Sequence, residues 1–212
     1  MIITIDGPSG AGKQKIATYI AKKYKLYHLD SGLLYRRLSA KLLLKKIDFD
    51  DTNKINKYLK SIKSISYRKH VSLRNEEIGK KTSKIATNPQ VRKFINKQQR
   101  LAVSKLLKKN IGCVIDGRDI GSEVFQNAQL KLFICANLKI RAKRRHKQLI
   151  EQGEKSIHSQ ILKDLKLRDT KDSTRKASPL IVPNGAVLID NSNSFESTII
   201  QIDKALKKLN QL

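Results

Sequence analysis

A glycine-rich stretch near the N-terminus has the residue types and the spacing that bind phosphate. Residues 7–13, GPSGAGK, fit the pattern G-x-x-x-x-G-K and directly follow the apolar run MIITID. In such a loop the backbone N–H groups point toward an anion, a helix N-terminus adds positive potential, and the lysine reaches the β- and γ-phosphates of a nucleotide. The competing interpretation is an ordinary glycine-rich turn between a strand and a helix. The candidate nucleotide-binding residues are Gly7, Pro8, Ser9, Gly10, Ala11, Gly12 and Lys13.

The residues after this loop depart from the usual pattern. A serine or threonine hydroxyl normally follows the lysine and holds Mg²⁺ beside the phosphates, whereas Gln14 and Lys15 follow Lys13 here. An ammonium group has hydrogen-bond donors only, so Lys15 cannot ligate a metal ion. Lys15 either turns toward solvent or places its charge near the phosphates and partly replaces the metal. The strong hydration of exposed lysines favours the first outcome.

Three further motifs carry polar side chains. DGRD, residues 116–119, ends an apolar run, where the Asp116 carboxylate could hold Mg²⁺ directly or through water, although Asp-Gly is also common in plain turns. LDSGLLYRR, residues 29–37, occupies a predicted strand-to-helix turn. RDTKDSTR, residues 168–175, carries charged residues at spacings of four and three, which would place them on one face of a helix. The competing interpretation is a ladder of ion pairs on the protein surface. The candidate side chains are Ser31, Tyr35, Arg36, Asp116, Arg118, Asp119, Arg168, Asp172 and Arg175.

Apolar runs and helical periodicity predict the elements that must position these residues. Strands are predicted at residues 2–6 and within 27–32, 112–121, 130–137 and 186–191. Helices are predicted at about 13–24, 33–46, 52–63, within 76–109, and at 138–152, 157–168 and 195–210. The run at 130–137 is apolar throughout, as in strands that are buried on both faces. Apolar and polar residues alternate weakly over residues 64–75, as in a small exposed hairpin. Gly153 can end the helix predicted at 138–152.

The alternation of strands and helices predicts the fold class. It is typical of an α/β protein with a parallel, doubly wound sheet, in which ligands bind outside the carboxyl ends of the strands. The glycine loop, residues 30–32 and the DGRD motif all follow such strand ends. At 212 residues the chain can form one α/β core with a small appendage, so we expect one domain that spans residues 1–212.

Charge and cysteine content indicate which binding partners and which cellular compartment to expect. The formal net charge is +27, but 33 lysines against 12 arginines, spread along the chain, favour a solvated surface over specific nucleic-acid binding. Cys113 and Cys135 lie in apolar segments without zinc-ligand spacing, and buried thiols suit a reducing compartment. The first residues do not resemble a signal peptide, and no apolar run approaches the roughly 20 residues that span a bilayer. We therefore expect a soluble, cytoplasmic protein without a membrane partner.

Together the motifs resemble those of the bacterial cytidylate kinases, a branch of the nucleoside-monophosphate kinases. The resemblance runs through ITIDGPSGAGK, LDSGLLYR, NPQVR with QQR, IDGRDIGSEVF, RAKRRHKQL, LRDTKD and SPL. It implies a P-loop kinase fold with a small monophosphate-binding insertion at roughly 60–100 and a basic lid at roughly 140–175. It also implies transfer of the γ-phosphoryl group of ATP to CMP or dCMP with the help of Mg²⁺. We expect the protein to be a monomer.

The resemblance further implies a role for each matching residue. Ser31 and Asp119 match positions that contact the amino group of cytosine, and Arg100 matches the position that reads the ring acceptors. Arg36 and Arg118 match a clamp on the acceptor phosphate, a task that suits the guanidinium fork. Other matches are Tyr35 beside CMP, Ser83, Arg168 and Asp172 at the sugar, Arg175 at phosphate, Arg141, Arg144 and Arg145 in the lid over ATP, and Asp116 at the metal. The resemblance implies that the catalytic residues are Lys13, Arg118 and Arg175.

Two departures from the family pattern leave alternatives open. Gln14 and Lys15 replace the residues expected after the loop lysine, and the stretch RNEEIGKKTSKIA reaches Ser83 without the longer connection expected there. One alternative is a related P-loop small-molecule kinase with another acceptor, although Ser31, Arg100 and Asp119 favour cytosine over uracil, whose edge reverses the donor pattern. The other is a catalytically impaired nucleotide- or RNA-binding protein, which the lysine substitution and the net charge of +27 would suit.

Overall fold

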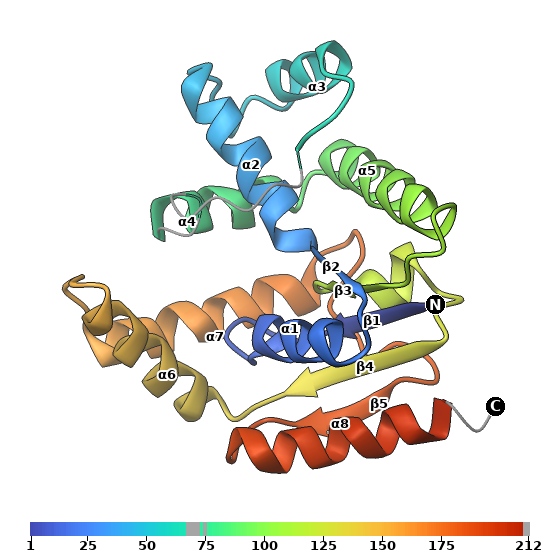
Figure 1. The fold of residues 1–212 in the computed structure, drawn as a ribbon. Coiled ribbons are helices and arrows are strands. Elements are labelled where there is room, and N and C mark those ends of the chain that lie inside the picture. Colours follow the sequence, from blue (N-terminus) through green and yellow to red (C-terminus); the bar gives the residue numbers. More distant parts are fainter. Residues whose placement is uncertain (67–72, 74–75, 210–212) are drawn as a thin grey trace. The chain divides into compact units, whose positions relative to one another are not determined.

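The computed structural model describes residues 1–66, 73 and 76–209 (Figure 1). The chain divides into two compact units. The sheet unit comprises Met1–His28 and Gly112–Leu212, and the helical unit comprises Leu29–Ile111. Among the helices that the structure describes, none is both long enough and apolar enough to cross a membrane.

One five-stranded sheet has the strand order β2-β3-β1-β4-β5. Its strands are β1 (Ile2–Asp6), β2 (Tyr27–Asp30), β3 (Cys113–Asp116), β4 (Leu130–Cys135) and β5 (Val187–Asp190). β1 pairs in parallel with both β3 and β4, and β4 pairs in parallel with β5. Ile3 and Ile5 of the central strand are fully buried. The predicted parallel α/β sheet is confirmed.

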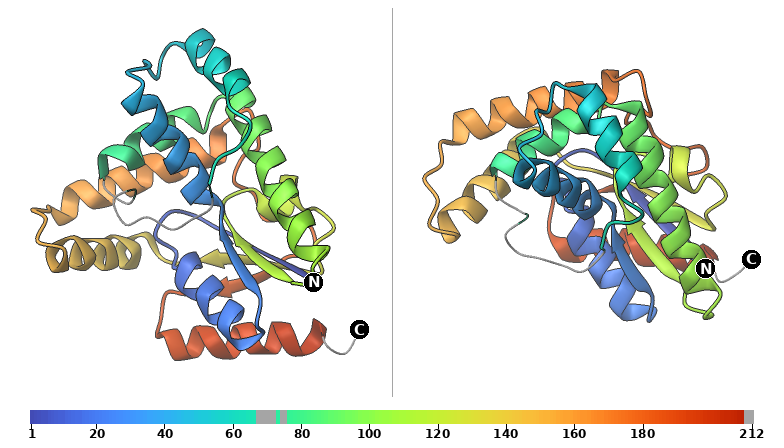
Figure 2. Two further views of the ribbon diagram at one scale, coloured as in Figure 1. Left: turned by 45° about the horizontal axis from the view of Figure 1, so that its top comes forward. Right: turned by 90° about the horizontal axis from the view of Figure 1, so that it is seen from above.

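Among the residues that the structure describes, the sheet unit also contains four α-helices. They are α1 (Lys13–Lys23), α6 (Leu138–Glu151), α7 (His158–Thr174) and α8 (Phe195–Leu209). Ile16 and Ile20 of α1 share one apolar core with Ile202 of α8 and with the buried residues of the strands. The two views of Figure 2 accordingly show α1 beside α8. α6 packs against α7 after a turn at Gly153, which has the left-handed φ of 75° that favours glycine.

The sheet unit differs from the sequence prediction in four places. α7 continues to Thr174 through residues expected to be a polar segment, and a π-helix, η2 (Ile120–Val124), follows the DGRD motif. Burial along β4 alternates, so the expected burial on both faces is wrong for Phe133 and Cys135, which are only half-buried. Of the two thiols expected to be buried, Cys113 is buried and Cys135 is not fully so.

The helical unit contains α2 (Ser31–Leu44), α3 (Thr52–Ser61), α4 (Glu76–Ile85) and α5 (Pro89–Leu107). Side-chain caps fix three of their starts: Asp30 accepts from the Leu33 N–H, Asp51 from Lys54, and Asn88 from Gln90 and Val91. Leu34, Leu38, Ile55, Ile85 and Ile95 form the apolar core. Most of the predicted hairpin at 64–75 lies outside the described residues.

Candidate active site

The backbone of the phosphate-binding loop requires glycine at two positions. Gly7 and Gly12 have φ values of 145° and 89°. A Cβ atom on Gly7 would lie 2.1 Å from the Ile134 carbonyl oxygen, and one on Gly12 would lie 2.2 Å from the Asn191 Nδ2. Both positions therefore exclude a side chain, as expected for a loop whose backbone N–H groups are turned toward an anion.

Asn191, directly after β5, holds the loop from outside. Its Nδ2 donates to the Ala11 carbonyl at 2.8 Å, while its Oδ1 accepts from the Thr198 hydroxyl at 2.8 Å. Asn191 and Thr198 are both buried. The loop backbone is thus fixed before any ligand contributes, which is the preorganisation that charge-stabilising sites need.

Lys13 is the first residue of α1, and its ammonium group is buried. The Nζ donates to the Pro8 carbonyl at 2.6 Å. Burial lowers the pKa of Lys13 well below its ordinary range, and the nearby Arg118 lowers it further, while carboxylates oppose the shift. Those carboxylates belong to Asp116, Asp6 and Asp172. A buried cation beside a guanidinium is a site that a polyanion such as a nucleotide phosphate chain stabilises.

Asp6, at the end of β1, organises the residues that follow DGRD. Its buried carboxylate accepts the backbone N–H groups of Ile120 at 2.8 Å and of Gly121 at 2.7 Å. Burial raises the pKa of Asp6 to about 6, although the two hydrogen bonds lower it. Sequence reasoning missed this residue. Its signal was a single carboxylate at the end of an otherwise apolar central strand.

The DGRD motif and the end of α7 meet in a cluster of ion pairs. Arg118 Nε donates to Asp172 Oδ2 at 3.1 Å, and Arg175 Nη1 donates to Asp172 Oδ1 at 3.4 Å. Arg175 Nη2 also lies 3.7 Å from Asp119 Oδ1. Burial would raise the pKa of Asp172, but the guanidinium groups of Arg118, Arg168 and Arg175 lower it below the ordinary value. Five predicted site residues are therefore neighbours in the sheet unit.

Asp116, the predicted metal-binding carboxylate, has a partner that the sequence did not reveal. His28 Nε2 lies 2.7 Å from Asp116 Oδ1, and His28 Nδ1 lies 3.5 Å from the Thr18 hydroxyl. Both partners of the His28–Asp116 pair have buried side chains. Within the described residues no group of three or more His, Cys, Asp or Glu side chains could hold a metal ion. Asp116 fits Mg²⁺ that takes most of its ligands from phosphate oxygens and water.

Lys15, the residue in place of the expected hydroxyl, packs on α8. It is exposed, and its Nζ lies 3.8 Å from the centroid of the Phe195 ring. This is a cation–π contact, a geometry that stabilises an ammonium group at the surface. Lys15 is thus exposed as expected, with an aromatic contact that the sequence did not predict.

Arg141, a predicted lid residue, is buried and ties three segments together. Its Nη1 donates to the Ser9 carbonyl at 2.9 Å and lies 2.6 Å from Asp169 Oδ2, and its Nε donates to the Ala136 carbonyl at 2.9 Å. The Ser9 N–H in turn donates to Asp169 Oδ1 at 3.4 Å. Arg141 therefore links the phosphate-binding loop to α7.

The two other lid arginines differ from Arg141. Arg144 donates to the carbonyl of Asn191, whose side chain binds the phosphate-binding loop, at 2.6 Å and to the carbonyl of Asn193 at 3.0 Å. Arg145 donates to Gln148 Oε1 at 2.9 Å, within its own helix. Their contact with ATP phosphates remains a prediction.

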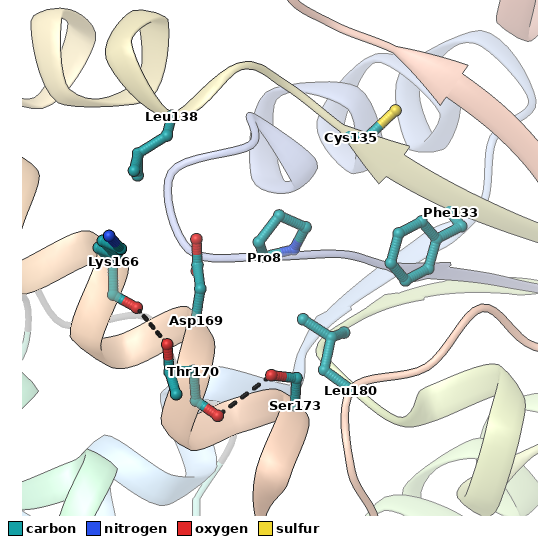
Figure 3. A pocket seen from close by; sticks show the side chains of 9 residues that line it. All are labelled: Pro8, Phe133, Cys135, Leu138, Lys166, Asp169, Thr170, Ser173 and Leu180. Atoms are coloured by element: carbon teal, nitrogen blue, oxygen red, sulfur yellow. Dashed lines mark hydrogen bonds between the residues drawn. The ribbon is translucent and has the colours of Figure 1, made fainter.

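A pocket lies beside the loop, between β4 and α7 (Figure 3). Its volume is about 350 Å³, and its lining consists of Pro8, Phe133, Cys135, Leu138, Lys166, Asp169, Thr170, Ser173 and Leu180. The hydroxyls of Thr170 and Ser173 donate to carbonyls one turn earlier in α7. Lys13 and the arginines of the ion-pair cluster do not line it, so this pocket borders the candidate phosphate site without containing its charged groups.

In the helical unit, two predicted substrate residues lie buried on α2. Ser31 Oγ accepts from Gln99 Nε2 at 3.4 Å, and the guanidinium carbon of Arg92 lies 5.9 Å from the centroid of the Tyr35 ring. Arg92 is itself buried, with its Nη1 donating to the Ala86 carbonyl at 2.9 Å. Sequence reasoning passed over both α5 residues, Arg92 and Gln99.

The remaining predicted residues of this unit are more accessible. Arg36 Nη1 donates to the Leu73 carbonyl at 3.0 Å. Ser83 is half-buried on α4, and Arg100 is exposed on α5. The helical unit therefore brings Ser31 and Tyr35 to α5, whereas Arg100 points away from its buried face.

Comparison with known proteins gives a consistent result. The family model for cytidylate kinase matches residues 3–211. A cytidylate kinase of Bartonella tribocorum is 40% identical over 198 residues, covering 93% of this chain and 90% of the relative. One of Fusobacterium nucleatum is 37% identical over 220 residues, covering 99% and 98%. A solved structure, TT1252 from Thermus thermophilus, aligns with a TM-score of 0.50 at 16% identity, covering 99% and 97%, which supports the fold alone.

Proposed function

Because this chain belongs to the cytidylate kinase family, we propose that it phosphorylates CMP and dCMP with ATP. The observation that carries the site assignment is the buried ammonium of Lys13 at the start of α1. This group follows a glycine loop that excludes side chains, and it lies within electrostatic reach of Arg118. We assign ATP to the loop, residues 7–13, and to Arg141, Arg144 and Arg145.

The reaction requires positioning and charge rather than a general base. An oxygen of the CMP phosphate attacks the γ-phosphorus of ATP, and the bond from that phosphorus to the bridging oxygen of ADP breaks. Lys13, Arg118 and Arg175 would spread the negative charge of the transferring group. Mg²⁺, when bound, would neutralise phosphate oxygens, with Asp116 holding it directly or through water. Asp172, paired with both arginines, keeps their guanidinium forks oriented.

Acceptor recognition is assigned to the residues that match the family's contacts with CMP. Ser31 and Asp119 would accept from the cytosine amino group, and Arg36 with Arg118 would clamp the acceptor phosphate. Tyr35, Ser83, Arg168 and Asp172 would contact the rest of the nucleotide. For the ring acceptors, Arg100 is the prediction from the family resemblance. The buried Arg92 over Tyr35 is a second candidate, because a buried guanidinium reads a planar base edge with less competition from water.

A coupled assay that offers each nucleoside monophosphate with ATP and Mg²⁺ tests this function. We expect CMP and dCMP to be the best acceptors, UMP to be much poorer and AMP to be inert, because each mismatched buried polar group costs about 1–3 kcal/mol. Preferential phosphorylation of AMP would refute the proposal. ATP-independent RNA binding that weakens steeply with salt, without turnover of any monophosphate, would support an RNA-binding role instead.

We also propose that the enzyme acts as a cytoplasmic monomer without a nucleic-acid partner. Light scattering after size-exclusion chromatography should give the mass of one 24.1 kDa chain. A dimer mass at micromolar concentration would contradict that part of the proposal.

A further inference from the structure

One face of α5 buries polar side chains. Arg92, Asn96 and Gln99 follow the spacing i, i+4, i+7, and they are 3%, 8% and 1% exposed. We call these three residues the polar face of α5. Burying polar groups is unfavourable unless each finds a hydrogen-bond partner, so such a face requires an explanation.

Partners within the described residues account for only part of this face. Gln99 Nε2 donates to Ser31 Oγ, but Gln99 Oε1 has no hydrogen-bond partner among the residues that the structure describes. The same holds for Asn96 Oδ1. Buried acceptors without partners are rare in native structures, and a bound ligand or an ordered water can complete them.

The unpartnered oxygen lies beside a residue assigned to the base. Gln99 holds Ser31, the predicted reader of the cytosine amino group, and Tyr35 lies one turn further along α2 against Arg92. Asp119, the acceptor predicted from the family resemblance, belongs to the ion-pair cluster with Arg175, and Gln99 is the alternative to it as the second acceptor of the amino group. An amino group offers two protons and is best satisfied by two neutral or anionic acceptors.

We propose that Gln99 is a specificity-determining residue, whose Oε1 accepts a hydrogen bond from the 4-amino group of cytosine while its Nε2 fixes the Ser31 hydroxyl. This inference rests on the proposed function. Uracil carries a carbonyl oxygen where cytosine carries the amino group, so it would place an acceptor against Gln99 Oε1. Sites built to hydrogen-bond a substrate group reject an analogue that lacks it, because their own buried polar atoms are left unpaired.

Gln99→Met is the direct test, because methionine has a similar volume and neither an amide donor nor a carbonyl acceptor. We expect kcat/KM for CMP to fall by about 10- to 100-fold while the value for UMP changes by less than about threefold, so that the CMP/UMP ratio collapses. The control is Gln98→Met on the same helix. Gln98 is also buried, and its amide donates to the Lys63 carbonyl at 3.1 Å. This control loses a comparable hydrogen bond but should keep the ratio.

Gln99→Glu provides the second variant in case the methionine variant does not fold. A carboxyl group keeps an acceptor oxygen in either protonation state, so the preference for CMP should persist. A ratio unchanged in Gln99→Met, or lost in Gln99→Glu, overturns the assignment of Gln99. A wild-type enzyme that fails to phosphorylate CMP would instead refute the proposed function, so the two failures are distinguishable.

Discussion

Replacement of Asp6 by asparagine should change how the stability of the chain depends on pH. The Asp6 carboxyl is fully buried, accepts two backbone N–H groups of η2, and has its pKa raised to about 6. The folded chain therefore holds this proton more tightly than the unfolded chain, in which the pKa is 3.8. The stability contributed by the proton is complete below pH 3.8 and is lost as the pH rises from there to about 6.

The size of this effect follows from the two pKa values. A difference of about two units corresponds to about 3 kcal/mol of unfolding free energy, of which about 2 kcal/mol is lost between pH 4.5 and 7. Asparagine does not titrate in this range. Its carbonyl oxygen can accept one of the two N–H groups, but its amide opposes the other, which costs about 1–3 kcal/mol at every pH. The stability advantage of wild type over Asp6→Asn should therefore shrink by about 2 kcal/mol across that interval.

Urea unfolding of both proteins, followed by circular dichroism at several pH values, measures this difference. Subtracting the two free energies at each pH cancels the shared titrating groups that do not interact with Asp6, which leaves Asp6 and its charged neighbours Asp119 and Lys13. A difference that stays constant within about 0.5 kcal/mol from pH 4.5 to 7 would refute the raised pKa. In that case burial of Asp6 would be offset by its hydrogen bonds, which are the opposing cause.

Three further variants test the chemical site. Lys13→Ala should lower kcat by orders of magnitude while the melting temperature stays near that of wild type. Near-normal turnover would refute the assignment of the loop as the ATP site. Lys15→Thr should lower the Mg²⁺ concentration needed for half-maximal rate at saturating substrates. Identical Mg²⁺ titration curves for the two proteins would show that Lys15 does not affect metal binding. His28→Phe removes the partner of Asp116 and should raise that Mg²⁺ requirement about 10-fold with little change in the KM for CMP; an unaltered requirement would show that His28 does not orient the carboxylate.

The secondary structure of the sheet unit was predictable because its strands are short apolar runs with clear ends. α7 was predicted too short for a physical reason. Leu165 and Asp172 are the buried residues of this helix, so the 3.6-residue period that marks helices is almost absent. The π-helix after DGRD was missed because the buried Asp6, more than a hundred residues away, binds its first N–H groups. Local sequence does not contain that cause.

The candidate site was predictable in composition but not in its pairings. The glycine loop and the DGRD motif carry chemistry that residue types alone express. By contrast, the contacts of His28 with Asp116 and of Lys15 with Phe195 join distant segments, which periodicity cannot reveal. Gln99 was missed for a related reason, since a glutamine in a polar helix is ordinary until its burial is known.

The position of β1 at the centre of the sheet has a consequence for synthesis on the ribosome. Both of its neighbours come late in the chain, because Ile2 pairs with Cys113 and Ile3 with Leu130. At about 5–20 residues per second, this apolar strand remains without a partner for roughly 5–20 s after it emerges.

The contacts that fix the phosphate-binding loop form later than the pairing of β1. Asn191, whose side chain binds the loop backbone, directly follows β5 in the chain, and Thr198, which binds Asn191, comes later still. A nascent chain that ends before Thr198 therefore lacks the side chains that fix the loop backbone. During that interval the exposed β1 is a natural binding segment for chaperones, and a truncated product that ends before β5 would be a substrate for proteolysis rather than a partially active enzyme.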